Sequence, residues 1–101
     1  MECNNRILTF PNGIMKVGNN YHYQIEANIE MFFLNLEQDK PDNALVWYEK
    51  ALQNAVMEQG NYISTKDFTE LVLVTYKNLN KEAFLKLRYK YFPDAEKTKY
   101  D

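Results

Sequence analysis

The sequence predicts a mainly α fold (α+β), in which a short N-terminal β-hairpin precedes a four-helix, bundle-like array. An Asn-Gly pair separates two short apolar runs near the N-terminus, and four later segments repeat apolar residues at helical spacing between capping and breaking residues. Because the chain has 101 residues, we expect a single domain over residues 1–93 and a flexible polar tail over residues 94–101.

The hairpin is expected over residues 6–17. Apolar runs at 7–10 and 14–17 flank Asn12-Gly13, and both of these residues tolerate the positive φ angles of a tight hairpin turn. An isolated hairpin is only marginally stable, so we expect it to pack against the helices.

The first two helices are expected over residues 21–37 and 43–59. Asp42 is the predicted N-cap of the second helix, and Gly60 suits the position just beyond its end. The first helix should turn one apolar stripe toward the core, formed by Ile25, Ile29, Phe32, Phe33 and Leu36.

The third helix is expected over residues 65–79. With Ser64 as its N-cap, the hydroxyl can accept from the backbone N–H of Asp67, and Ile63 and Phe68 then occupy the two positions of a hydrophobic staple. Its inward stripe should contain Phe68, Leu71, Val72, Thr75, Tyr76 and Leu79.

The fourth helix is expected over residues 81–91. Asn80 is its predicted N-cap, and Pro93 disfavours helical geometry at the residue before it. Three of the connections are short, so consecutive helices should pack as neighbours.

Composition narrows the classes of function. The net charge of −2 provides no general basic field, so we do not expect nucleic acid as a partner. One cysteine and one histidine cannot build a zinc site, and no motif joins a nucleophile, a base and an orienting group. We therefore expect no enzyme, no catalytic residue and no metal. Without a long apolar run or a signal peptide, we expect a cytoplasmic protein with no membrane partner.

Residues 63–91 resemble the second half of the ATP-cone domain, which regulates ribonucleotide reductases and forms part of the repressor of their genes. The similarity runs without a gap through Ile63-Ser64-Thr65-Lys66-Asp67-Phe68, Glu70-Leu71-Val72, Lys77-Asn78-Leu79-Asn80, Ala83-Phe84-Leu85-Lys86 and Tyr91. The resemblance implies two strands followed by four helices, with ATP or dATP as the ligand.

The resemblance also implies where a nucleotide would bind. ATP-cones carry a Lys-Arg-x-Gly turn that meets the nucleotide phosphates, and the matching place here reads Phe-Pro-Asn-Gly, which keeps Gly13 but lacks the basic pair. The hairpin and the first helix would then cover the base and phosphates, with Lys16 and Lys66 as the candidate cations.

Two charged surfaces are expected. A basic cluster could meet a phosphate, a nucleic acid or an acidic protein, or could be a solvated face favoured near the end of a helix by the helix dipole; its residues are Lys77, Lys81, Lys86, Arg88 and Lys90. An acidic surface on the first helix could meet a basic partner or could simply aid solubility, and its residues are Glu26, Glu30 and Glu37.

The chain is rich in aromatic residues, with eight Tyr, six Phe and one Trp. Exposed aromatic side chains act as anchors in protein interfaces, so we expect a partner surface or a self-association surface that includes Phe32, Phe33, Trp47, Tyr48 and Tyr89. The expected function is a non-enzymatic regulatory module, resembling an ATP-cone, that acts by contact with a protein partner. The alternative is a stand-alone interaction protein with no ligand, such as a small phage inhibitor of a host protein.

Overall fold

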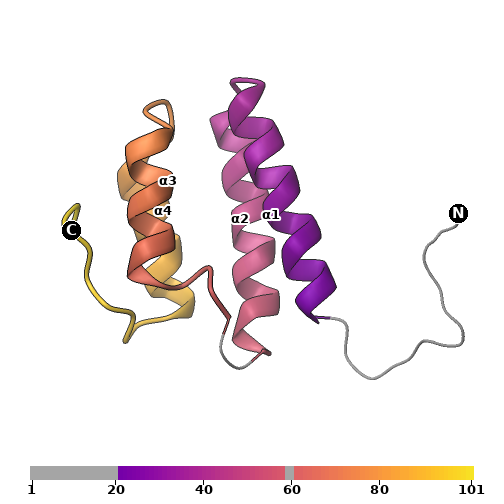
Figure 1. Cartoon of the computed structure of the whole chain (residues 1–101), viewed down its shortest axis with the longest axis vertical. Helices are drawn as coiled ribbons and strands as arrows, with labels where there is room; N and C mark the ends of the chain where they lie inside the picture. Colours follow the sequence, from indigo (N-terminus) through magenta and orange to yellow (C-terminus); the bar gives the residue numbers. More distant parts are fainter. Residues whose placement is uncertain (1–20, 59–60) are drawn as a thin grey trace, which may run out of the picture.

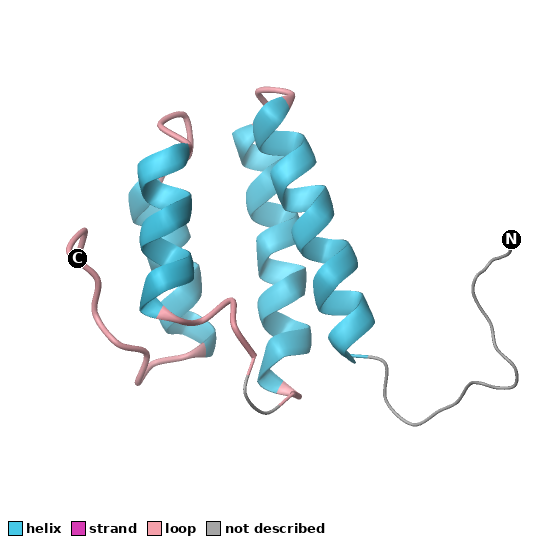
Figure 2. Cartoon of the chain, viewed as in Figure 1, coloured by secondary structure: helices cyan, strands magenta, loops and turns pink. Residues whose placement is uncertain are grey.

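The computed structural model describes residues 21–58 and 61–101. These residues form four helices and contain no strand (Figure 2). The chain runs alternately up and down, so that one antiparallel pair of helices stands beside another (Figure 1). In chain order the helices are α1 (Tyr21–Glu37), α2 (Pro41–Val56), α3 (Lys66–Thr75) and α4 (Lys81–Tyr91). The mainly helical fold is confirmed, whereas the predicted hairpin over residues 6–17 lies outside the described residues.

α1 and α4 have the bounds that the sequence predicts, but α2 begins two residues early, at Pro41, and ends three residues early, at Val56. The Asp42 cap is wrong: Lys40 occupies the N-cap position without a capping side-chain hydrogen bond, and Pro41 follows at the start of the helix. Proline suits that position because its fixed φ is helical and its missing N–H is not needed there. Asp42 instead places its carboxylate in the first turn, where the helix dipole favours a negative charge.

The Ser64 cap of α3 is also wrong, because Thr65 is the N-cap. Its Oγ1 accepts from the backbone N–H of Phe68 at 3.2 Å, so the positions of the expected staple move by one residue. The ring of Phe68 packs edge-on against Tyr62 at a centroid distance of 5.8 Å, while Ile63 is buried on its own account. Serine and threonine offer the same capping oxygen, so the sequence alone could not separate them.

α3 ends at Thr75, four residues before the predicted end. Tyr76 has an extended backbone, and its carbonyl accepts from the N–H of Leu79 in the turn that follows. That turn sets Asn80 in place as the N-cap of α4, where its side chain accepts from Ala83 N at 3.1 Å. The connection between α3 and α4 therefore uses residues that apolar spacing alone would assign to the helix.

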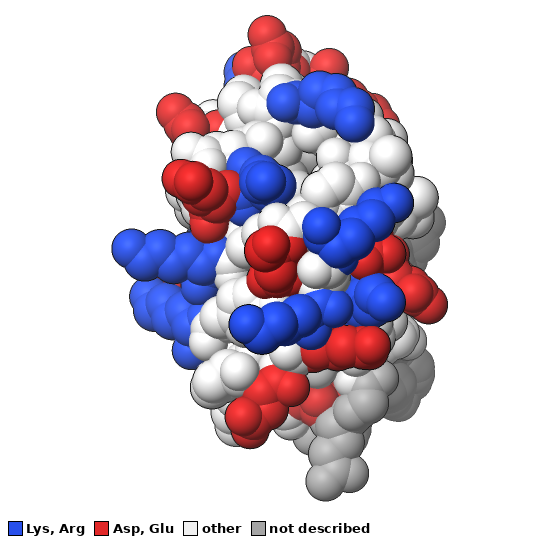
Figure 3. Space-filling view, turned by 90° about the vertical axis from the view of Figure 1, so that its left-hand side faces the viewer, with Lys and Arg blue, Asp and Glu red and all other residues white. Residues whose placement is uncertain are grey.

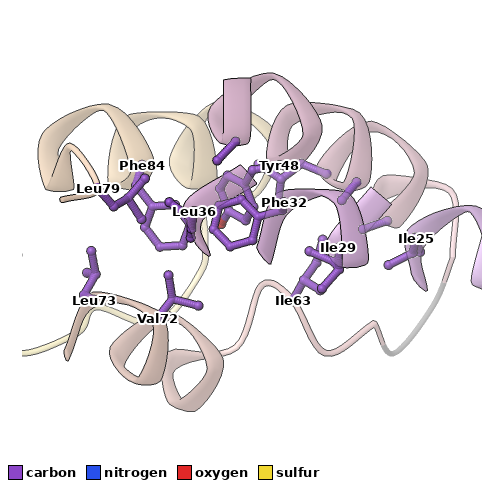
Figure 4. Packing of buried hydrophobic residues seen from close by; sticks show 14 of the residues in the cluster. Ile25, Ile29, Phe32, Leu36, Tyr48, Ile63, Val72, Leu73, Leu79 and Phe84 are labelled. Carbon is purple, nitrogen blue, oxygen red and sulfur yellow. The ribbon is translucent and has the colours of Figure 1, made fainter. Parts of the chain in front are cut away.

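Three aromatic rings from different helices fill the centre of the core (Figure 4). The ring centroids of Tyr48 and Phe84 are 4.3 Å apart, and Phe32 lies 5.4 Å from Tyr48 and 6.0 Å from Phe84. All three side chains are completely buried, so the prediction that Phe32 and Tyr48 belong to a partner surface is wrong. Burying each large apolar side chain stabilises the fold by about 1.5–3 kcal/mol, and this cluster joins the two helix pairs.

The Arg88 side chain is fully buried and holds three parts of the chain together. Its Nε and Nη2 donate to the carbonyl oxygen of Ser64 at 3.3 and 3.1 Å, Nη2 also donates to the carbonyl of Glu96 at 2.6 Å, and Nη1 donates to the Tyr89 hydroxyl at 3.1 Å. The guanidinium is well suited to this task because it directs five donors in a fixed plane. Arg88 is therefore wrong as a member of an exposed basic patch.

The C-terminal segment, residues 94–101, lies against α3 and α4 (Figure 1). The Tyr89 hydroxyl donates to Asp101 Oδ2 at 2.7 Å, and the backbone N–H of Lys99 donates to Glu70 Oε2 at 2.9 Å. Thr98 is buried, and the Tyr100 ring packs against the core. The residues expected as a flexible tail thus make specific contacts with both helices of the second pair.

Candidate functional site

An open groove of about 350 Å³ lies between α1 and α3, here called the α1–α3 groove. α1, α3 and the residue that follows α3 provide its lining side chains, which are Phe33, Glu37, Leu71, Val72, Thr75 and Tyr76. Because apolar residues form most of the lining, the groove suits the apolar side chains of a partner better than a strongly charged small molecule.

Aromatic rings form the wall of the groove and continue into the core. Phe33 lies 5.8 Å from Tyr76 and 6.2 Å from Phe68 between ring centroids, and it lies 5.2 Å from the buried ring of Phe32. Since Phe32 is fixed in the central cluster, Phe33 is held on a rigid base. A surface that is already rigid loses little conformational entropy when a partner binds.

Leu71 projects at the edge of the groove with 62% of its surface exposed. It belongs to four consecutive apolar residues in α3, which cover about 300° of a helix. The core takes Val72 and Leu73, so Leu71 and Val74 remain outside. The prediction that Leu71 faces the core is therefore wrong, and a run this long was the signal that one residue must stay exposed.

The rings of Tyr62, Phe68, Phe33 and Tyr76 form an aromatic row, in which each ring packs against the next. Carboxylates surround the end of this row at Tyr62. Partial burial and then the negative charges of Glu26, Glu58 and Glu30 raise the pKa of the Tyr62 hydroxyl above its ordinary value. His22 lies between two of these acids, with its Nδ1 3.5 Å from Glu58 Oε1 and its Nε2 3.9 Å from Glu26 Oε2. Glu37 lines the groove itself beside Phe33 and Tyr76, so acidic groups lie at both ends of the aromatic row.

The residues predicted for a partner surface do not form one surface. Phe33 alone among them lines the groove. Trp47 is half-buried on α2, where Lys50 Nζ lies 4.7 Å from its ring centroid. Tyr89 lies beside the C-terminal segment, and its hydroxyl is occupied by Asp101. Tyr76, which was not predicted for this role, joins Phe33 and Leu71 instead.

The predicted basic patch is divided by the fold. Arg88 is buried, and Lys90 Nζ lies 3.0 Å from Glu49 Oε2. The hydrogen bond to Glu49 and then the negative charge of that carboxylate raise the pKa of Lys90. Three members remain exposed and form no ion pair with another residue of 21–58 or 61–101: Lys77, Lys81 and Lys86. On the face drawn in Figure 3, basic side chains are interspersed with acidic ones, so this view shows no continuous basic surface.

The predicted nucleotide site can be followed at one position only. Lys66 is the first residue of α3 and is half-buried, whereas Gly13 and Lys16 lie outside the described residues. Among residues 21–58 and 61–101, no three His, Cys, Asp or Glu side chains are grouped so that they could hold a metal ion. None of the described helices is long and apolar enough to cross a membrane.

Comparisons of the chain with protein-family models, with curated proteins and with solved structures find no match. The resemblance to the ATP-cone domain therefore stays a prediction.

Proposed function

We propose that this chain is a non-enzymatic regulatory module that binds a protein partner in the α1–α3 groove. The observation that carries the proposal is the exposure of Leu71 beside the half-buried rings of Phe33 and Tyr76. A single exposed leucine is ordinary, but an exposed leucine at the edge of an aromatic groove provides both an anchor and a place for the partner's own anchor.

The chemistry along the groove supports binding rather than catalysis. Phe33, Tyr76 and Val72 supply contact area, and Glu37 is the single ionisable carboxylate in the lining. A catalytic nucleophile is commonly activated by an adjacent base that a third group orients, and the lining holds no such set of side chains. The lining therefore provides recognition of an apolar surface, with Glu37 to set orientation.

Substitution of Leu71 tests the proposal. Tagged wild-type protein, Leu71→Asp and Val46→Asp are used to capture partners from a cell lysate. Val46 is the control because it is a similarly exposed apolar residue on α2 (54% exposed) that does not line the groove. We expect the wild type and Val46→Asp to retain one stoichiometric partner that Leu71→Asp loses. Equal capture by all three proteins would contradict the proposal.

Adenine nucleotide would tune this module if the ATP-cone resemblance reflects shared function. The resemblance then requires ATP or dATP to bind in calorimetry and to change partner affinity, and Lys66→Ala to weaken that binding, because it removes a charge-assisted bond to a phosphate. If millimolar nucleotide gives neither heat nor a thermal shift, the nucleotide is rejected. The alternative would then stand, in which the chain is an interaction protein with no ligand.

A further inference from the structure

One side of α1 combines an aromatic anchor with carboxylates. Glu26, Glu30, Phe33 and Glu37 follow one another at spacings of four, three and four residues, which places them on the same side of a helix. Phe33 and Glu37 line the α1–α3 groove, so the two other carboxylates extend along the same side of α1 from the groove toward its N-terminus. α1 contains no Lys or Arg that could neutralise them.

The charges of α3 are divided between two sides of that helix. Asp67 precedes the exposed Leu71 by four residues and shares its side. Lys66 precedes Glu70 by four residues, and Glu70 accepts from the backbone of Lys99 in the C-terminal segment. The basic residue of α3 therefore lies on the side that meets the C-terminal segment, and the acidic Asp67 lies on the side of the groove.

We infer that the α1–α3 groove takes a basic amphipathic helix of a partner protein, with apolar side chains against Phe33 and Leu71 and with Lys or Arg beside Glu30, Glu37 and Asp67. This inference rests on the proposed function of the groove. It follows from the juxtaposition of a mostly apolar groove with Glu37 in its lining and further carboxylates on the same sides of α1 and α3, since charge complementarity selects partners and sets orientation. A helix presents apolar residues in one row and cations on both flanks of that row, which is the pattern that this groove complements.

A second copy of the chain fits the groove poorly. The helix that carries most of the positive charge is α4, and none of the large hydrophobic residues exposed among the described residues belongs to it. Its Arg88 is buried, and its Lys90 is paired with Glu49. α4 therefore lacks the apolar anchors that the groove requires, which favours a different protein as the partner.

Two synthetic helical peptides test the inference. One is built from Leu and Lys with leucines at helical spacing, and the other replaces each Lys with Glu. Titrated into the full chain and followed by calorimetry, the Leu/Lys peptide should bind at least about tenfold more tightly than the Leu/Glu peptide at low salt, and the difference should shrink as salt is added.

Charge reversal shows where the preference arises. Glu30→Lys/Glu37→Lys should remove the preference for the Leu/Lys peptide, whereas Glu82→Lys/Glu96→Lys makes the same change in net charge on exposed side chains away from the groove and should retain most of it. Because all four side chains are exposed, these variants keep the core, and circular dichroism checks that they remain helical.

Three results would overturn the inference: equal affinity for both peptides, equal loss in both double variants, or sedimentation that shows a dimer dependent on Leu71. None of them would decide the proposed function, which depends on partner capture by the wild type and its loss in Leu71→Asp. A captured partner together with equal peptide affinities would thus retain the groove as the binding site and reject a basic helix as its occupant.

Discussion

The two sides of the molecule treat their polar and apolar groups differently. Around α4 and the C-terminal segment, charged and polar side chains find partners within the chain, as Arg88 does at Ser64 and Glu96 and as Tyr89 does at Asp101. Along the α1–α3 groove, Leu71 remains exposed and Phe33 is covered only in part. The first region is closed by its own contacts, whereas the second has unused binding surface.

This difference separates residues that hold the fold from residues that are free to bind. Folding gains stability when polar groups are satisfied and apolar groups are buried. The α4 side obtains both, so substitutions there should change stability. The groove leaves apolar groups partly exposed and acidic groups in solvent, so substitutions there should change binding more than stability.

Substitution of the neighbouring residues Phe32 and Phe33 should give the largest difference in stability between the two sides. Phe32→Ala removes a fully buried ring from the central cluster and should lower the free energy of unfolding by about 3–5 kcal/mol. Phe33→Ala removes a half-buried ring and should cost about 1–2 kcal/mol while it weakens partner binding. Urea unfolding of both variants measures the difference, and equal losses would show that the groove wall is part of the core.

Arg88→Ala should have the next largest effect. It removes the donors that serve the carbonyls of Ser64 and Glu96, which would then lack those partners, and we expect a loss of about 2–3 kcal/mol. Amide hydrogen exchange should also become faster in residues 94–101. Lys86→Ala, an exposed position two residues earlier, is the control and should stay within about 0.5 kcal/mol of the wild type. A similar small loss in Arg88→Ala would mean that the segment is held by its other contacts.

Tyr48→Phe should have a small effect of the opposite sign. Within the part of the chain that the structure describes, the Tyr48 hydroxyl is buried without a hydrogen-bond partner. Removing an unsatisfied polar group should raise the free energy of unfolding by up to about 1 kcal/mol. Thermal unfolding at neutral pH measures the change. A clear loss of stability would reveal that the hydroxyl has a partner, such as an ordered water.

The same residue predicts a change at alkaline pH. Burial raises the pKa of Tyr48, and the charge of Arg88 offsets only part of the rise. The folded pKa exceeds the unfolded value of about 10. Ionisation of this tyrosine therefore leaves the free energy of unfolding unchanged below about pH 10 and lowers it as the pH rises further. Tyr48→Phe should therefore lose less stability than the wild type between pH 10 and the upper end of the titration, and parallel curves would contradict the assignment.

The smallest expected effect concerns Asp101 at acid pH. Burial acts to raise its pKa, but hydrogen bonds from Tyr89 and Thr98 hold the pKa below the ordinary aspartate value. The stabilisation is thus present above about pH 4 and is lost as the pH falls through the folded pKa. Protection from hydrogen exchange in residues 94–101, measured relative to the intrinsic exchange rate at each pH, should fall over that range in the wild type and vary less in Asp101→Asn. Identical pH profiles would assign the change to another group.

Local signals in the sequence were sufficient to predict both ends of two of the four helices, α1 and α4. Asn80 and Pro93 bracket α4, and α1 ends where Asp39 takes a left-handed conformation with φ of 60°. The end of α3 required knowledge of its neighbour, because the turn that frees Asn80 to cap α4 takes four residues that have helical apolar spacing. Residues 94–101 looked like a tail because their acceptors and donors come from distant segments.

The candidate site was less predictable than the fold because it depends on which apolar residues the core leaves uncovered. Periodicity placed Phe32 and Phe33 on one stripe, but the core contains the first and the groove the second. Arg88 counted as one surface cation among several, since its carbonyl partners are 24 and 8 residues away. Acidic residues on α1 were visible in the sequence, but their position beside an apolar groove was not.

Amide chemical-shift mapping of the full chain with the Leu/Lys peptide tests the division between the two sides most directly. If the α1–α3 groove is the binding surface, the largest shifts will fall on residues of α1 and α3 around Glu30, Phe33, Leu71 and Tyr76, and α4 with residues 94–101 will remain nearly unchanged. Shifts concentrated on α4 and the C-terminal segment, with the groove unperturbed, would contradict it.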